Sequence, residues 1–130
     1  MTIEEVQNEM RRMAQLIGAK SDQLPTVCRL QGGGRPNINI SDDDLLSYEA
    51  YERGLQVFCY TFTDLEELMY HTFQQVVPAM ASAHAMEMDP SGQDFHKHFL
   101  IKKIELMSRI KPEWGQRVED EYNQAPYWRG

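Results

Sequence analysis

The sequence predicts an α+β fold with an N-terminal helix, a small antiparallel sheet of three or four strands and three C-terminal helices. Apolar residues recur at helical spacing in the first 17 residues and again from residue 65 onward. Between these regions lie short alternating or aromatic runs separated by turn residues, a pattern typical of strands. Because the strands are grouped rather than interleaved with helices, the class is α+β. With 130 residues, 42% of them apolar, the chain is long enough to bury the core of one domain spanning residues 1–130.

The first element is an amphipathic helix over residues 3–17. Thr2 and Glu5 have the spacing of a capping box, in which each side chain accepts a hydrogen bond from the other residue's backbone N–H. Gly18 follows the last apolar residue and is suited to end the helix. The apolar face consists of Ile3, Val6, Met10, Met13 and Ile17.

Four short segments are predicted as strands: residues 24–30, 37–40, 45–52 and 55–62. A run of three glycines followed by Arg35-Pro36 interrupts the chain between the first two. The dipeptide Arg53-Gly54 joins the last two as a hairpin, since glycine readily adopts the positive φ of a tight turn.

The remainder is predicted to be helical. Thr63 and Glu66 form a second capping box, and apolar residues mark one helix face from Leu65 to Met80. The run Asp89-Pro90-Ser91-Gly92 is expected to end this helix. Pro78 lies inside this pattern and predicts either a kink or a restart of the helix. A further helix is expected from about residue 93 to 110, and Pro112 suits the first position of a last helix.

The negative charge is concentrated in one part of the chain. The formal net charge is −7, and residues 41–70 contain eight acids and one base, Arg53, so this window alone carries −7. Such a field repels phosphate backbones and favours a basic partner. We therefore expect a protein partner and no nucleic acid.

Compartment and membrane association follow from composition. Apolar runs reach only four or five residues, too short to span a membrane. Residues 1–5 lack the basic and apolar regions of a secretory signal. Two cysteines do not make a disulfide framework, so Cys28 and Cys59 are predicted to be free, buried thiols. These observations predict a soluble, cytoplasmic protein.

The candidates for catalysis or metal binding are weak. Di-iron helical bundles use Glu-x-x-His, whereas Glu67 and His71 are four residues apart and His84 precedes Glu87. The glycine run lacks the Lys-Ser/Thr of a phosphate loop, and the three consecutive aspartates lack the spacing of a calcium loop. We therefore predict no enzyme, no cofactor and no metal. The alternative is a small metal-dependent enzyme or metal-binding protein that uses His71, His84 and Glu87.

Several short motifs occur in a characteristic order between Leu24 and Trp114. They are Leu24-Pro25-Thr26, Gly34-Arg35-Pro36, Glu52-Arg53-Gly54, the acidic-aliphatic run Thr63 to Tyr70, Met80-Ala81, Gly92-Gln93-Asp94-Phe95, Lys103 with Glu105-Leu106, and Pro112-Glu113-Trp114. In this order they resemble the immunity protein 63 family of bacterial polymorphic-toxin systems. The resemblance implies an inhibitor that binds and neutralises a cognate secreted toxin domain in the cytoplasm of the producing cell, during interbacterial competition. It brings no defined binding surface with it.

The charge and the resemblance together suggest which surface binds. A toxin that attacks nucleic acid needs a basic surface, which an acidic protein can occupy as a phosphate mimic. We predict that seven acids face the toxin: Asp42, Asp43, Asp44, Glu49, Glu52, Glu66 and Glu67. Reversal of Asp43 and Glu49 to lysine is then expected to slow association at low salt. A second interpretation, a solubilising face with binding elsewhere, stays open, and so does the choice between monomer and homodimer.

Overall fold

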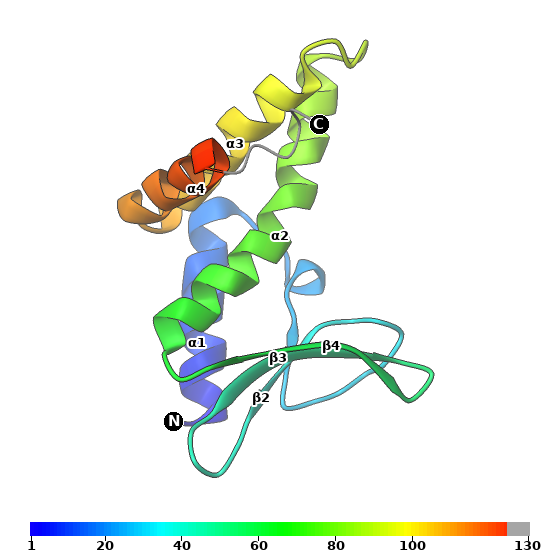
Figure 1. Cartoon of the computed structure of the whole chain (residues 1–130), viewed down its shortest axis with the longest axis vertical. Helices are drawn as coiled ribbons and strands as arrows, with labels where there is room; N and C mark the ends of the chain where they lie inside the picture. Colours follow the sequence, from blue (N-terminus) through cyan, green and yellow to red (C-terminus); the bar gives the residue numbers. More distant parts are fainter. Residues whose placement is uncertain (125–130) are drawn as a thin grey trace. The chain divides into compact units, whose positions relative to one another are not determined.

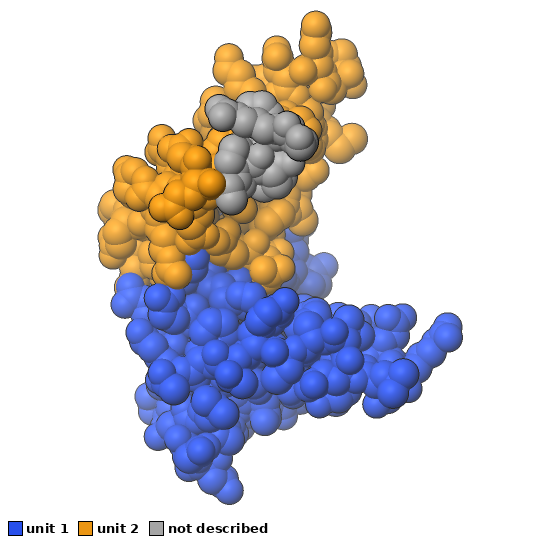
Figure 2. Space-filling model, in the orientation of Figure 1, with its two compact units in different colours: residues 1–72 blue, residues 73–130 orange. Residues whose placement is uncertain are grey.

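A computed structural model describes residues 1–124 of the chain (Figure 1). The elements are α1 (Ile3–Ile17), a 3-10 helix η1 (Ser21–Gln23), β1 (Thr26–Val27), β2 (Asn37–Ile40), β3 (Leu46–Glu52), β4 (Leu55–Phe62), α2 (Leu65–Met88), α3 (Phe95–Ile110) and α4 (Pro112–Gln124). This order confirms the predicted α+β class. The chain forms two compact units, Met1–Thr72 and Phe73–Gly130 (Figure 2). The single-domain organisation stays a prediction.

Helix α1 has the predicted bounds and caps. The N–H of Glu5 donates to the Thr2 hydroxyl oxygen over 3.1 Å, and that hydroxyl donates to the Glu5 carboxylate over 3.2 Å. Gly18 ends the helix in the left-handed region at φ 75°. The predicted apolar face is buried at Val6, Met10, Met13 and Ile17, whereas Ile3 is exposed.

The sheet has four strands in the order β1-β2-β3-β4, and it is mixed rather than purely antiparallel as predicted. β1 pairs with β2 in parallel, and the other two pairings are antiparallel. The reason lies in the connection: Gly32, Gly33 and Gly34 all have positive φ, which lets a short loop bring the chain back to run alongside β1. β1 is only two residues long, so the strand predicted over 24–30 is largely loop.

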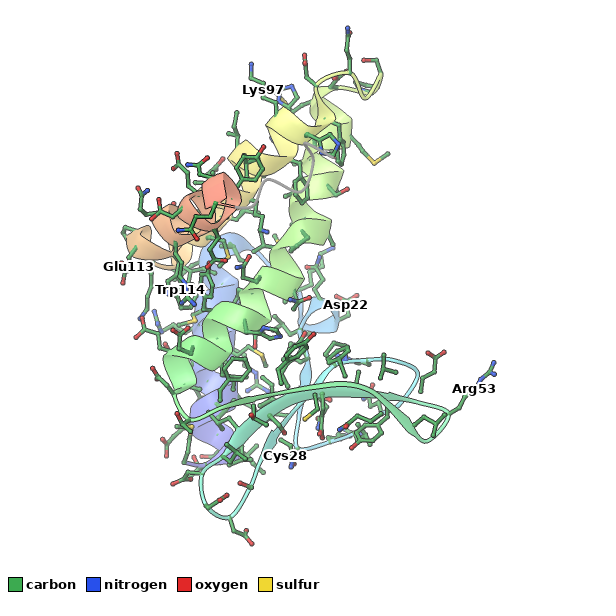
Figure 3. The ribbon with its side chains drawn as sticks, in the orientation of Figure 1. Asp22, Cys28, Arg53, Lys97, Glu113 and Trp114 are labelled. Atoms are coloured by element: carbon green, nitrogen blue, oxygen red, sulfur yellow. The ribbon has the colours of Figure 1, made fainter. Side chains whose placement is uncertain are left out.

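The β3–β4 hairpin is joined by Arg53 and Gly54, as predicted. Both residues have positive φ, 54° and 79°, which is the pattern of a type I′ turn. Figure 3 shows Arg53 at the tip of the hairpin, with its side chain directed away from the sheet.

β3 and β4 differ sharply in burial. On β3 the side chains of Leu46, Tyr48 and Ala50 are buried. Their partners on β4 are Phe62, Tyr60 and Phe58, which are exposed or only half-buried. This contrast arises because β4 is an edge strand of the sheet, with a neighbour on one side only.

Helix α2 begins one residue later than the second capping box predicts. Its N-cap is Asp64 rather than Thr63, because the Asp64 carboxylate accepts the N–H of Glu66 over 3.0 Å. The helix then runs without interruption through Pro78, so it does not restart there.

In the second unit, α3 and α4 pack against each other. α3 starts two residues after the predicted position, and α4 starts at Pro112 as predicted. The buried side chains that α3 and α4 contribute are Leu106, Met107, Ile110, Trp114 and Val118.

Candidate functional site

Two acidic segments that are far apart in sequence meet at one end of the sheet. The β2–β3 turn precedes Leu46, the β4–α2 junction follows Phe62, and these two residues are paired across the hairpin. The pairing therefore places the two sets of carboxylates at the same end of the sheet. We name this region the acidic end; it consists of Asp42, Asp43, Asp44, Asp64, Glu66 and Glu67, all exposed.

Local hydrogen bonds fix part of the acidic end. The N-terminal ammonium group binds the Asp44 carboxylate over 2.7 Å. The hydroxyl of Ser41 donates to Asp43 and holds the pKa of that carboxyl below its ordinary value. Asp43 therefore stays ionised at neutral pH, and the turn presents a negative surface.

A hollow lies within the acidic end. It has a volume of about 290 Å³ and is lined by Leu45, Thr61, Phe62, Thr63, Asp64 and Glu67. Leu45 and Phe62 supply apolar surface, and two carboxylates stand beside them. This combination suits a lysine or arginine side chain. Such a side chain packs its aliphatic stem against apolar surface and keeps its charged group next to a carboxylate or in water.

The structure does not bring all seven predicted residues together. Five of them, Asp42, Asp43, Asp44, Glu66 and Glu67, belong to the acidic end. Glu52 lies at the other end of β3, and six strand rises of about 3.3 Å put it roughly 20 Å from Leu46. Glu49 is in the middle of β3, opposite Cys59 and half-buried.

Sequence reasoning missed two features of this region. Asp64 was counted in the acidic window but not among the binding residues, although its place before the helix start is a signal for a helix cap. The sequence also contains no signal that the apolar side chains of β4 are uncovered, and the structure shows Leu55, Val57 and Tyr60 exposed. An apolar strand sequence does not reveal that the strand lies at an edge.

The prediction that both cysteines are buried is wrong. Cys28 and Cys59 are free, as predicted, but both are exposed. Cys59 is exposed because β4 is an edge strand with solvent-accessible side chains. Cys28 lies directly after β1, at the opposite edge of the sheet, with φ 53°.

The residues of the metal-dependent alternative do not form a site. His71 belongs to the first unit, whereas His84 and Glu87 belong to the second. More than three turns of α2 separate the two histidines. Within residues 1–124 no group of three His, Cys, Asp or Glu side chains could hold a metal ion.

His71 instead belongs to an aromatic cluster on the inner face of the sheet. Its ring lies 4.7 Å from Tyr48, 4.9 Å from Tyr60 and 5.3 Å from Phe62, measured between centroids. Its Nε2 atom is buried without a hydrogen-bond partner. Desolvation lowers the pKa of His71, and burial raises the pKa of Tyr48 to about 12.

This burial predicts that acid destabilises the first unit through His71. With a folded-state pKa below the ordinary 6.5, the unfolded chain binds the proton first as pH falls. The free energy of unfolding therefore decreases from pH 6.5 downward, toward the lowered pKa. His71→Phe keeps an aromatic ring in the cluster and is expected to reduce this loss.

Thermal unfolding at about pH 7.5 and about pH 5.5 measures the effect. His96→Gln is the matched control, because His96 is exposed on α3. If the drop in Tm on acidification is the same in His71→Phe as in the unmodified chain, His71 is not its source.

The comparison with known families identifies the class of protein. Residues 42–124 match the model of the family described as Immunity protein 63, which includes the acidic end, β3, β4 and all three C-terminal helices. The match extends over more than half of the chain. The chain therefore belongs to the immunity protein 63 family, as the sequence motifs suggested. No curated protein and no solved structure matches it.

No helix within residues 1–124 combines the length and the apolar character that crossing a bilayer requires.

Proposed function

We propose that the chain binds and neutralises the toxin domain of a cognate secreted bacterial protein, in the cytoplasm of the cell that produces both. Membership of the immunity protein 63 family supports the general role. The proposed binding surface rests on the acidic end, where two segments about 20 residues apart lie at the same end of the sheet. Together they carry six exposed carboxylates, and two of these, Asp64 and Glu67, line the hollow.

The chemistry of this surface favours a basic toxin, and a nuclease in particular. An enzyme that cleaves nucleic acid holds phosphates on lysine and arginine side chains. A surface with several exposed carboxylates can occupy the same side chains and so exclude the substrate. Complementary potentials also raise the rate of encounter, which suits an inhibitor that must act before the toxin does damage.

The competing account of the acidic end is a solubilising face. The two accounts predict different effects of mutation. If the acidic end only keeps the protein in solution, association with a partner has no reason to depend on these particular carboxylates. The hollow supports the binding account, because a lysine or arginine side chain can cover its apolar surface and pair with its carboxylates at the same time. Water can only solvate the carboxylates.

A capture experiment tests the proposed function. The tagged chain is used to retain proteins from its native cells at low and moderate salt, and the retained proteins are identified by mass. We expect the C-terminal domain of a large secreted protein. Expression of that domain in a neutral host should arrest growth, and co-expression of this chain should restore growth.

Two results would contradict the proposal. One is a captured domain whose toxicity is unaffected by the chain. The other is the absence of any neutralised partner together with stoichiometric metal in the purified protein, which would favour a metal-dependent function instead.

A further inference from the structure

The free edge of the sheet is formed by its longest strand. β4 has eight residues, against two, four and seven for β1, β2 and β3. Its neighbour on one side is β3, and among residues 1–124 the backbone of β4 makes no hydrogen bond with any segment besides β3. An uncovered edge of this length is a template for a further strand.

β4 also lacks the charged and proline residues by which many proteins protect such an edge. Residues 55–62 contain no charged side chain and no proline. Leu55, Val57 and Tyr60 are 74%, 56% and 52% exposed. One irregularity is present, since Ala50 pairs with Phe58 and Tyr51 with Gln56, which leaves Val57 as an extra residue. The regular stretch that remains available runs from Phe58 to Phe62.

The hollow of the acidic end lies where this regular stretch ends. Thr61 and Phe62, the last two residues of β4, line it together with Asp64 and Glu67. A strand added along β4 would therefore bring one of its terminal side chains to these two carboxylates. The strand edge and the hollow are contiguous parts of one surface.

Charge decides which occupant this surface fits. A second copy of the chain carries the same net charge of −7 and offers only Arg53 as a base within residues 41–70. Two copies would repel each other overall. A segment with a lysine or arginine at the end of the added strand would instead form a charge-assisted contact at the hollow.

We infer that the toxin domain binds by adding an extended segment to the free edge of β4, with a basic side chain of that segment in the hollow at the acidic end. This inference rests on the proposed function and specifies its binding mode. Main-chain hydrogen bonds to β4 supply affinity that does not depend on side-chain identity, and the hollow supplies specificity for a basic residue.

The two cysteines provide a matched test. Cys59 lies on β4, Cys28 lies beyond β1 at the opposite edge of the sheet, and both are free and exposed. In the Cys28→Ser variant the remaining thiol is Cys59, and in the Cys59→Ser variant it is Cys28. Each remaining thiol can be labelled with a polyethylene glycol maleimide. The Cys59 side chain projects from a face of the sheet on its edge strand, so a bulky polymer attached there would obstruct a strand added beside β4. A polymer at Cys28, at the opposite edge, would not.

Binding of the purified toxin domain recovered by capture is then measured for each labelled and unlabelled chain. We expect the Cys59 label to weaken binding by about 100-fold or more and the Cys28 label by less than about threefold. Hydrogen exchange should show new protection of β4 amides in the complex. Equal affinity of the two labelled chains, with no new protection in β4, would overturn the inference while leaving the proposed function intact.

The other outcomes are equally decisive. A toxin domain that the unlabelled chain fails to bind contradicts the proposed function itself. A free chain that is dimeric in solution, and that becomes monomeric on labelling of Cys59, would assign the edge to a second copy and overturn the inference.

Discussion

Replacement of Asp42 and Glu67 by lysine is expected to slow association with the toxin domain by roughly 10- to 100-fold at low salt. The double change replaces two negative charges by two positive ones at the acidic end. It therefore removes the potential that draws a basic surface toward this part of the sheet. Stopped-flow or surface-based kinetics at several salt concentrations measure the effect, which should shrink as salt screens the charges.

These two positions are better suited than the pair Asp43 and Glu49 that the sequence suggests. Asp43 accepts the Ser41 hydroxyl in the turn, so its replacement also disturbs the local structure. Glu49 is half-buried in the middle of β3. Asp42 is exposed in the turn, and Glu67 lines the hollow.

Asp22→Lys is the matched control for Asp42→Lys. It makes the same chemical change at an exposed position in η1, which is not part of the acidic end. Asp42→Lys alone is expected to reduce the association rate severalfold more than Asp22→Lys does. Equal effects of the two single changes would show that only net charge matters and that the acidic end has no special role.

The elements could be predicted from sequence largely because their local signals are strong. α1 combines a capping box, a helical apolar face and a terminal glycine, and its bounds are as predicted. β2 and β4 also have their predicted bounds. The parallel pairing of β1 could not be predicted, because strand direction is determined by where a flexible glycine loop returns rather than by the strand residues themselves.

The site could be predicted only in part, for a related reason. The distribution of charge along the sequence locates the acidic window. The pairing of Leu46 with Phe62 decides which of its carboxylates share one surface. This pairing adds Asp64 to the acidic end and leaves Glu52 at the hairpin tip. The same limit explains the cysteines: the sequence of β4 is that of a buried strand, and only sheet order shows that it lies at an edge.

Gly115→Ala is expected to destabilise the second unit, although alanine is the better helix former. In a helix interior this change normally stabilises by about 0.5–1 kcal/mol. Here a Cβ at position 115 would lie 1.7 Å from the Ser108 Oγ, 2.9 Å from the Ser108 Cβ and 3.0 Å from the Ile104 carbonyl oxygen. Rotation of the Ser108 hydroxyl relieves only the first contact, so α3 and α4 must move apart. We expect a net loss of about 1–3 kcal/mol in the free energy of unfolding, measured by urea denaturation.

A double-mutant cycle distinguishes this close approach from a general effect of substitution in α4. Ser108→Gly removes both side-chain atoms that the new Cβ would meet, so Gly115→Ala should cost less in that background than in the natural one. Gln116→Ala, at the exposed neighbouring position, should change the free energy of unfolding by less than about 0.5 kcal/mol. A stabilising Gly115→Ala, or one whose cost is unaffected by Ser108→Gly, would mean that α3 and α4 do not meet at this glycine. The close approach explains why a poor helix former occupies a buried position in α4, where local propensity alone would favour alanine.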